Sequence, residues 1–470
     1  MAQAQRRKSR RKRSTPAPPV FRISLPDTYA ALVAAVLFVF LVLGGGGTSN
    51  PYTEVVLECV VAGLALLGLW LTGQTGVPRR TPRTALVLAG LALLIPVAQL
   101  VPLPPSLWHG LPGRQPEIDA LALIGQAQRW MPLSMAPART FAALLAILAE
   151  VGLFIAVARL DLGGRMQLCA VIVAVGAMAA VLGSLQLSHA GGYHWVLYED
   201  TNIGWIVGFH ANRNAATDTF QIAILAVAAY LGQATGPRKL PPIQIGLATL
   251  VMIVLAIAAV LTGSRTGMLL LPLTYLFAVW LAWPLLRRTG TLLSWGFLLL
   301  VPIAGATLAA TGPVQQALGR FAIDNDHRWD IWHDTLRATG SVWPIGSGVG
   351  SFQVAYDSAQ SIERMQILLD LRAHNDWLEW ALEAGIPGLI VLGVIGAILL
   401  FRNIDALRQA LRRNSDRQMR VQTLFATGTL LHLGLHGVFD YPVRSMALAA
   451  LATTAAAMLM PVRIDGAVSE

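Results

Sequence analysis

Apolar residues recur along this chain in long blocks, and short polar segments separate one block from the next. A helix needs about 20 apolar residues to cross the ~30 Å hydrocarbon core of a bilayer, and the blocks have about that length. The pattern predicts about twelve membrane spans. They lie near residues 29–43, 54–73, 84–102, 139–158, 166–188, 214–232, 242–262, 266–286, 291–311, 377–401, 420–438 and 441–461. We therefore predict an all-α polytopic membrane protein.

One polar interval, residues 312–376, is much longer than the others and lies between the ninth and tenth predicted spans. Its polar and turn-forming groups are Arg320, His327, Arg328, Trp332, the Gly-rich segment from Trp343 to Phe352, Arg372, His374 and Asn375. Arginine binds polyanions, and an imidazole can take up a proton near neutral pH. We expect this loop to carry an active site that the helices hold at the membrane surface.

The composition supports the membrane assignment, since 55% of the 470 residues are hydrophobic and only 13% are charged. A soluble protein of this length would need more charge to cover its surface. Many of the basic residues lie in short loops on one side of the predicted spans: Arg79, Arg80, Arg83, Arg159, Arg165, Arg238, Lys239, Arg287, Arg288 and those of 402–420. Short basic loops stay in the cytoplasm. Both termini are therefore predicted to be cytoplasmic, and the long loop is predicted to be periplasmic if the host is a bacterium with two membranes.

The chain divides into a basic cytoplasmic tail, residues 1–27, a transmembrane domain, residues 28–461, and a short cytoplasmic tail, residues 462–470. The basic run Arg6–Arg13 would suit nucleic acid or anionic lipid, but beside a span it is typical of a cytoplasmic anchor. We therefore predict contact with membrane lipids and no nucleic-acid partner. We find no cluster of metal-ligating residues and no Gly-rich loop of the nucleotide-binding kind, so neither a metal nor a cofactor is predicted.

Arg265 lies where two predicted spans meet, between Gly263 and Gly267. A guanidinium at the membrane boundary is costly unless it is paired or hydrated, so it is a functional candidate, and an arginine that reaches lipid phosphates is the alternative. Arg328 and Trp332 are four residues apart in a segment of helical character and would share one helix face. Two arginines that approach one point suit a pyrophosphate, because each guanidinium can bind two oxygens.

His374 and Asn375 close the long loop directly before the span that begins near Trp377. A histidine at the mouth of a helical bundle can act as a general base near neutral pH, although a lone histidine is more often a structural hydrogen-bonding group. Several carboxylates lie nearby in the sequence, and which of them orients the ring is open: Asp370, Asp376, Glu379 and Glu383.

Two further polar clusters are predicted on the same face of the membrane. Phe209–Asn214 precedes a span and offers Arg213 as a third phosphate contact. His436–Pro442 joins the last two spans, where Asp440 could pair with an arginine or cap a helix. The candidate substrate-binding residues are therefore Arg213, Asn214, Trp332, Arg372, Asn375 and Asp440.

The ordered motifs of residues 190–445 resemble those of the O-antigen ligase family of bacterial membrane glycosyltransferases. The resemblance rests on Thr262-Gly263-Ser264-Arg265, Arg328 with Trp332, the segment Pro344–Phe352, His374-Asn375, Glu383-Ala384-Gly385 and His436–Pro442. It implies a GT-C-like helical fold in the inner membrane and a metal-independent, inverting transfer. The implied donor is a glycan on undecaprenyl pyrophosphate, held by Arg265 and Arg328, while His374 would act on the acceptor hydroxyl.

The resemblance leaves the acceptor open, because the family includes lipid A–core ligases, polysaccharide polymerases and protein O-oligosaccharyltransferases. The acceptor is expected to be a glycan or a lipid-linked molecule, and an O-antigen or exopolysaccharide polymerase is the main alternative to a ligase. From other classes, a lipid-linked oligosaccharide transporter and a non-catalytic scaffold are the competing hypotheses. A transporter is expected to place charged sites near the middle of the membrane, often in two related halves, and this sequence has no evident repeat.

Overall fold

The computed structural model describes residues 28–46, 56–57, 60–61, 63, 81–188, 195–198, 201–233, 241–286, 312–322, 327–364, 370–412 and 416–462. The span predicted near 291–311 lies outside these residues, and the one predicted near 54–73 lies almost entirely outside them.

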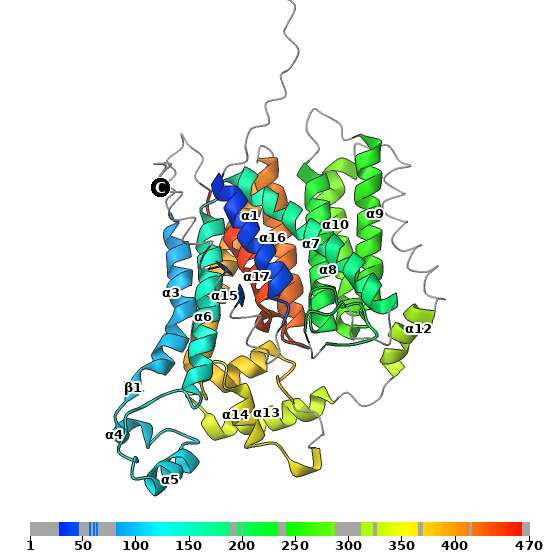
Figure 1. Cartoon of the computed structure of the whole chain (residues 1–470). Helices are drawn as coiled ribbons and strands as arrows, with labels where there is room; N and C mark the ends of the chain where they lie inside the picture. The colour runs from blue at the N-terminus through cyan, green and yellow to red at the C-terminus, as the bar shows by residue number, and fades with distance from the viewer. Residues whose placement is uncertain are drawn as a thin grey trace, which may run out of the picture.

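The described long helices follow the predicted spans closely (Figure 1). They are α1 (Thr28–Leu43), α3 (Arg83–Leu100), α6 (Pro137–Ala158), α7 (Leu162–Ser188), α8 (Arg213–Gln233), α9 (Pro242–Leu261), α10 (Arg265–Leu286), α15 (Asp376–Ala410), α16 (Arg417–His436) and α17 (Met446–Met458). Among the described residues, seven helices are long and apolar enough to cross a membrane, and α1 and α17 are shorter apolar helices. The predicted α-helical, polytopic class is confirmed, while these residues account for fewer spans than the predicted twelve.

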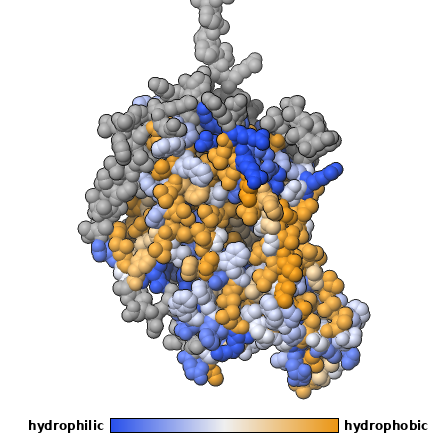
Figure 2. Space-filling view, turned by 180° about the vertical axis from the view of Figure 1, so that it is seen from behind, coloured by the Kyte–Doolittle hydropathy of each residue, from blue (hydrophilic) through white to orange (hydrophobic). Residues whose placement is uncertain are grey.

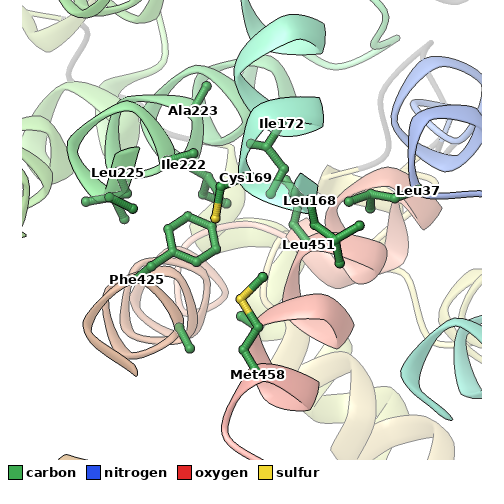
Figure 3. Close-up of a cluster of buried hydrophobic side chains, with 14 of the residues drawn as sticks. Leu37, Leu168, Cys169, Ile172, Ile222, Ala223, Leu225, Phe425, Leu451 and Met458 are labelled. Atoms are coloured by element: carbon green, nitrogen blue, oxygen red, sulfur yellow. The ribbon is translucent and has the colours of Figure 1, made fainter. Parts of the chain in front are cut away.

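The helix α8 lies at the centre of the bundle, where it packs against α7, α9, α10 and α16. Every residue from Asn214 to Ala229 is buried. Figure 3 shows part of the apolar core around it, where Cys169 of α7 and Phe425 of α16 lie close to Ile222 of α8. The first turns of α8 nevertheless carry polar side chains such as Asp218, which must find hydrogen-bonding partners inside the protein.

Shorter elements gather at one end of the bundle, the lower end in Figure 1, which we call the loop face. They are α4 (Pro105–Trp108), α5 (Gln115–Leu123), α12 (Gly312–Gly319), α13 (Arg328–Val342), α14 (Phe352–Asp357), and the 3-10 turns η1 (Arg320–Ala322), η2 (Ile362–Arg364) and η3 (Pro442–Arg444). Two short antiparallel strands, β1 (Pro102–Leu103) and β2 (Met131–Pro132), pair there as well. The sequence did not predict this pair, because strands of two residues carry no periodic pattern.

The helix α13 shows why the long loop is ordered. Its buried positions Ile331, Ala338 and Val342 recur at helical spacing and pack against α14 and Leu382 of α15. The helix ends at Val342, and Trp343 is extended, because the proline that follows it disfavours helical backbone in the preceding residue.

A break in α15 ties this loop to the bundle. Gly385 has a φ of +56°, and a Cβ placed there would lie 2.3 Å from the Pro344 carbonyl oxygen. Pro387 has no N–H, so the Glu383 carbonyl lacks its usual helical partner. Two outside donors replace it: the Gly348 N–H at 2.8 Å and the Gln99 side-chain amide at 2.9 Å. The loop is therefore fixed to α15 and α3 next to the candidate site.

The outer surface agrees with a membrane location. Figure 2 shows apolar side chains across the middle of the molecule and hydrophilic residues below them, at the loop face. Exposed apolar side chains of this kind include Leu269, Leu276, Ile390 and Leu400, which belong to α10 and α15. Lipid would cover such a surface at no hydrophobic cost.

Candidate active site

His374 lies at the entrance of α15, in a conformation that its neighbours hold. Its φ of +49° is uncommon for a residue other than glycine. The next residue, Asn375, caps α15 by accepting hydrogen bonds from the Trp377 and Leu378 N–H groups, each at 3.0 Å. The imidazole packs edge-on against Tyr441 at 4.9 Å between ring centroids.

Asp440 is the carboxylate that orients the His374 ring. The His374 Nδ1 and Asp440 Oδ1 atoms are 3.1 Å apart. Burial opposes the ionisation of Asp440, but the hydrogen bond from His374 and the charge of Arg328 outweigh it, so the pKa of this carboxyl lies well below its usual range. An ionised carboxylate only accepts hydrogen bonds, so His374 Nδ1 carries a proton, and in the neutral imidazole Nε2 is the nitrogen with the lone pair. This arrangement suits a general base.

The carboxylates that lie closer to His374 in the sequence have other partners. Glu379 accepts hydrogen bonds from Arg372 and from the Ala373 N–H, both at 3.0 Å. Glu383 pairs with Arg444 at 2.8 Å, and Asp376 lies 3.7 Å from the same guanidinium. Asp370 accepts a hydrogen bond from the Tyr356 hydroxyl at 3.0 Å. Arg372, a candidate for substrate binding, thus forms a partly buried ion pair that holds the segment before His374.

Burial opposes the charge of Arg444, but Glu383 and Glu379 outweigh it and raise the pKa of the guanidinium above its usual range. Arg444 is therefore a permanent cation among three acidic side chains. It fixes η3 to the first turns of α15, and with it the position of the Asp440 loop relative to His374.

Four arginines converge beside this pair, and we call them the arginine cluster: Arg213, Arg265, Arg320 and Arg328. The charges of the other three all act on Arg213. Arg328 donates a hydrogen bond to the Phe439 carbonyl at 2.6 Å and lies 3.9 Å from Asp440. Arg320, which the sequence analysis noted but did not select, donates to the Gly263 carbonyl at 2.7 Å. These like charges repel one another, so a bound polyanion would stabilise the arginine cluster.

An aromatic ring holds part of the arginine cluster in place. The guanidinium of Arg213 lies 5.2 Å from the centre of the Trp205 ring, and that of Arg320 lies 5.7 Å from it. Gly263 has a φ of +64°, and a Cβ at that position would lie 2.3 Å from the Trp205 ring. The glycine before Arg265 therefore serves close packing against Trp205, and not only a turn between two helices.

The two loop clusters predicted separately are joined in the structure. Asn212 donates a hydrogen bond to the Tyr441 hydroxyl at 3.0 Å and accepts one from the Asn214 N–H at 2.8 Å. Burial and the Asp440 charge raise the pKa of Tyr441, so the phenol stays neutral. Asn214 itself is buried in the first turn of α8, where the Asn212 side chain caps its N–H.

Trp332 lies on the face of α13 that also carries Arg328, as predicted from their spacing. Its ring is 6.3 Å from Phe439 and 4.9 Å from Trp329, and its indole N–H has no hydrogen-bond partner. Arg328 and Trp332 therefore both meet the segment that ends in Asp440.

A cavity of about 810 Å³ opens next to His374. Its walls come from α3, α6, α15, α16 and α17 and are mostly apolar. Arg372, Asp376 and Trp377 line it near the loop face, and Glu150 of α6 lies on its wall about 16 Å along that helix from Arg139 at the other end. We call this space the apolar cavity. It is long enough to hold an alkyl or isoprenyl chain beside the site.

The sequence analysis found no cluster of metal-ligating residues, but the fold brings three side chains of that type together. Asp218 of α8 meets His432 and His436 of α16, and the three side chains offer ligand atoms within 4.8 Å of one another. The sequence held a signal that was missed, since two histidines four residues apart lie on one helix face. Their carboxylate partner is more than two hundred residues away, so its approach depends on the tertiary fold.

Comparison with known proteins identifies one part of the chain. Residues 250–393 match the family model described as O-Antigen ligase, and no curated protein matches the chain. The resemblance predicted from the motifs is confirmed over this segment, which contains Arg265, Arg328 and His374. Arg213 and Asp440 lie outside it, and the fold brings them to the same place.

Proposed function

We propose that this chain, which carries an O-antigen ligase domain over residues 250–393, transfers a glycan from an undecaprenyl-pyrophosphate donor to a hydroxyl acceptor at the loop face. The domain implies glycan transfer at a membrane in surface polysaccharide biosynthesis. The observation that carries the proposal is the meeting of the arginine cluster with the His374–Asp440 pair.

The arginine cluster supplies what a pyrophosphate leaving group needs. Each guanidinium stays charged and can bind two phosphate oxygens. Charge develops on the bridging oxygen as the glycosidic bond breaks, and fixed cations stabilise it without a metal ion. Arg265 and Arg328 are the proposed main contacts, with Arg213 and Arg320 beside them.

His374 is the proposed general base. Its Nε2 removes the proton from the acceptor hydroxyl as the oxygen attacks the anomeric carbon, and Asp440 stabilises the imidazolium that forms. The bond from that carbon to the pyrophosphate breaks, and undecaprenyl pyrophosphate leaves. A single attack from the side opposite the leaving group inverts the anomeric centre.

The acceptor divides the proposal into two versions. A ligase uses a different glycolipid as the acceptor, whereas a polymerase extends a glycan of the same kind as the donor. The apolar cavity beside His374 supports a lipid-anchored acceptor in both versions. Deletion of the gene separates them, because loss of attachment leaves long lipid-linked chains and loss of polymerisation leaves single repeat units.

The proposal is tested with His374→Ala in a reconstituted transfer assay. Loss of a general base is expected to slow single-turnover transfer about 10²- to 10⁴-fold, with donor binding retained, because the arginines hold the pyrophosphate. His333→Ala is the matched control, since His333 is exposed on α13 in the same loop region. Normal transfer by His374→Ala at saturating donor would remove His374 from the mechanism, and loss of donor affinity alone would assign it to binding.

A further inference from the structure

The three side chains Asp218, His432 and His436 form a buried cluster that the proposed transfer does not use. They are at most 3% exposed and join α8 to α16 inside the bundle. The carboxylate oxygen Oδ1 of Asp218 lies 2.8 Å from His432 Nε2 and 2.5 Å from His436 Nδ1. One oxygen atom is therefore the meeting point of two imidazoles from successive turns of the same helix.

Neighbouring hydrogen bonds indicate that Nδ1 of His432, the ring nitrogen that faces away from Asp218, carries a proton. The Gln221 amide donates to the Gly267 carbonyl at 2.8 Å, so its oxygen faces Thr274 and accepts that hydroxyl proton at 2.8 Å. The Thr274 oxygen, 3.2 Å from His432 Nδ1, must then accept from the ring. A neutral His432 consequently directs the lone pair of Nε2 at the Asp218 carboxylate. Two acceptors cannot face each other at this distance unless a proton or a metal ion lies between them.

Two polar atoms of this cluster take part in no hydrogen bond, which indicates that the cluster could bind a cation. Asp218 Oδ2 and His436 Nε2 are both buried and have no hydrogen-bond partner. A buried carboxylate with one bare oxygen is costly unless a cation balances it. A small cavity of about 10 Å³ touches Asp218 and also Asn214 and Asp440, and it has room for about one water molecule.

We propose that Asp218, His432 and His436 bind a divalent transition-metal ion, zinc by preference, which joins α8 to α16. Two histidines one helical turn apart with a carboxylate from a neighbouring helix form a donor set that zinc prefers. Oxygen-seeking ions such as magnesium and calcium do not select two imidazoles. A water molecule in the small cavity would complete a four-coordinate site.

Binding of a zinc ion would require the three ligand side chains to move by no more than about 1–2 Å. Ligand atoms around a tetrahedral zinc ion stand about 3.3 Å apart, because each bond is about 2.0–2.1 Å long. The Asp218 carboxylate would withdraw from each imidazole by less than about 1 Å, and the two ligating nitrogens, which lie within 4.8 Å of each other, would approach by up to about 1.5 Å. His432 Nδ1 already donates its proton to Thr274, as the outer nitrogen of a metal-bound histidine usually does.

The role of this ion is structural. The first turn of α8 carries Arg213 of the arginine cluster, and α16 leads directly into the segment that ends at Asp440. An ion bound between these two helices would fix the distance between the arginine cluster and the His374–Asp440 pair. It does so from a buried position, so the proposal does not depend on the function proposed above and needs no metal in the transfer step.

The test measures metal in the intact protein. Full-length chain is purified in detergent without chelators from zinc-supplemented cells, and its metals are determined by elemental analysis. We expect about one zinc ion per chain in the wild type and in His333→Ala, and less than about a tenth of that in His432→Ala and Asp218→Ala. Wild-type protein without zinc, or equal zinc in wild type and His432→Ala, overturns the proposal.

A second measurement needs only the wild type and so does not depend on how the variants fold. X-ray absorption at the zinc edge is expected to show two imidazole nitrogens and oxygen ligands at about 2.0–2.1 Å. A spectrum without imidazole scattering, or with sulfur ligands, places the ion elsewhere and contradicts the assignment.

Discussion

His374 illustrates how a single residue in this protein depends on partners from distant segments. Its backbone is in the left-handed region, and the Asn375 cap, the Asp440 carboxylate and the Tyr441 ring all help to hold it there. Asp440 lies 66 positions further along the chain. Such strain persists only where the surroundings fix it, and sites of this kind are often functional.

The role of Arg265 is tested at the residue scale with Arg265→Lys. Lysine keeps the charge but loses the planar fork, so we expect transfer about 10- to 100-fold slower, the worth of a charged hydrogen bond to phosphate. Arg337→Lys is the control, because Arg337 is an exposed arginine on α13. Unchanged transfer and donor affinity in Arg265→Lys would mean that this arginine only meets lipid phosphates, and the protein must be compared at equal folded yield.

The sequence analysis could select candidate residues, but it could not predict which side chains would be their partners. Arg265 stood out because it lies where two apolar blocks meet, between two glycines, and His374 stood out because it closes the long polar loop directly before a span. The partner of His374 could not be chosen, because the four carboxylates that were considered all lie nearer in the chain than Asp440 and only packing excludes them. The Asp218–His432 contact spans 214 positions and was missed for the same reason.

Among the elements, α15 shows where a predicted span and the observed helix differ. The prediction ended the span at residue 401 and placed 402–419 in a basic loop, but the helix continues to Ala410. Helical backbone does not stop where the apolar pattern stops, because charged residues such as Arg402 and Arg408 favour helix as well. The break at Gly385 was also not foreseen. Pro387 is a local signal for it, whereas the close approach of the Pro344 carbonyl comes from another part of the chain.

The break in α15 gives a prediction with an internal control. Gly385→Ala puts a methyl group against the Pro344 carbonyl and forces alanine into a left-handed conformation, so we expect poor folding or a loss of at least about 1–3 kcal/mol of stability. Gly393→Ala lies on the same helix with no atom within 4 Å of the added carbon. It should be neutral or stabilise the helix by up to about 1 kcal/mol.

Thermal melting of both glycine variants in the same detergent measures the difference. If Gly385→Ala melted like Gly393→Ala, then the loop from 343 to 352 would not be anchored to α15 as described. Transfer by the surviving Gly385→Ala protein should fall as well, because that loop and His374 share the first turns of α15.

The arrangement of the whole molecule in the membrane remains a prediction of the charge pattern. We expect the loop face outside the cytoplasm and the segment 402–419 inside it. Cysteine is placed at two exposed positions, Ile362→Cys and Leu411→Cys, in a chain whose native Cys59 and Cys169 are replaced by serine. An impermeant thiol reagent on intact spheroplasts should modify position 362 and spare 411, and the reverse result would invert the topology.

The two substrate regions of the molecule have separate walls. The arginine cluster belongs to α8, α10, η1 and α13, whereas the apolar cavity lies among α3, α6, α15, α16 and α17, and the His374 segment stands at the edge of both. Under the proposed function, donor and acceptor would then bind without displacing each other, and neither would have to leave before the other arrives. The steady-state kinetics would then fit a ternary-complex mechanism with random order of substrate addition. Double-reciprocal plots would give intersecting lines, whereas a mechanism with a covalent glycosyl-enzyme would give parallel lines.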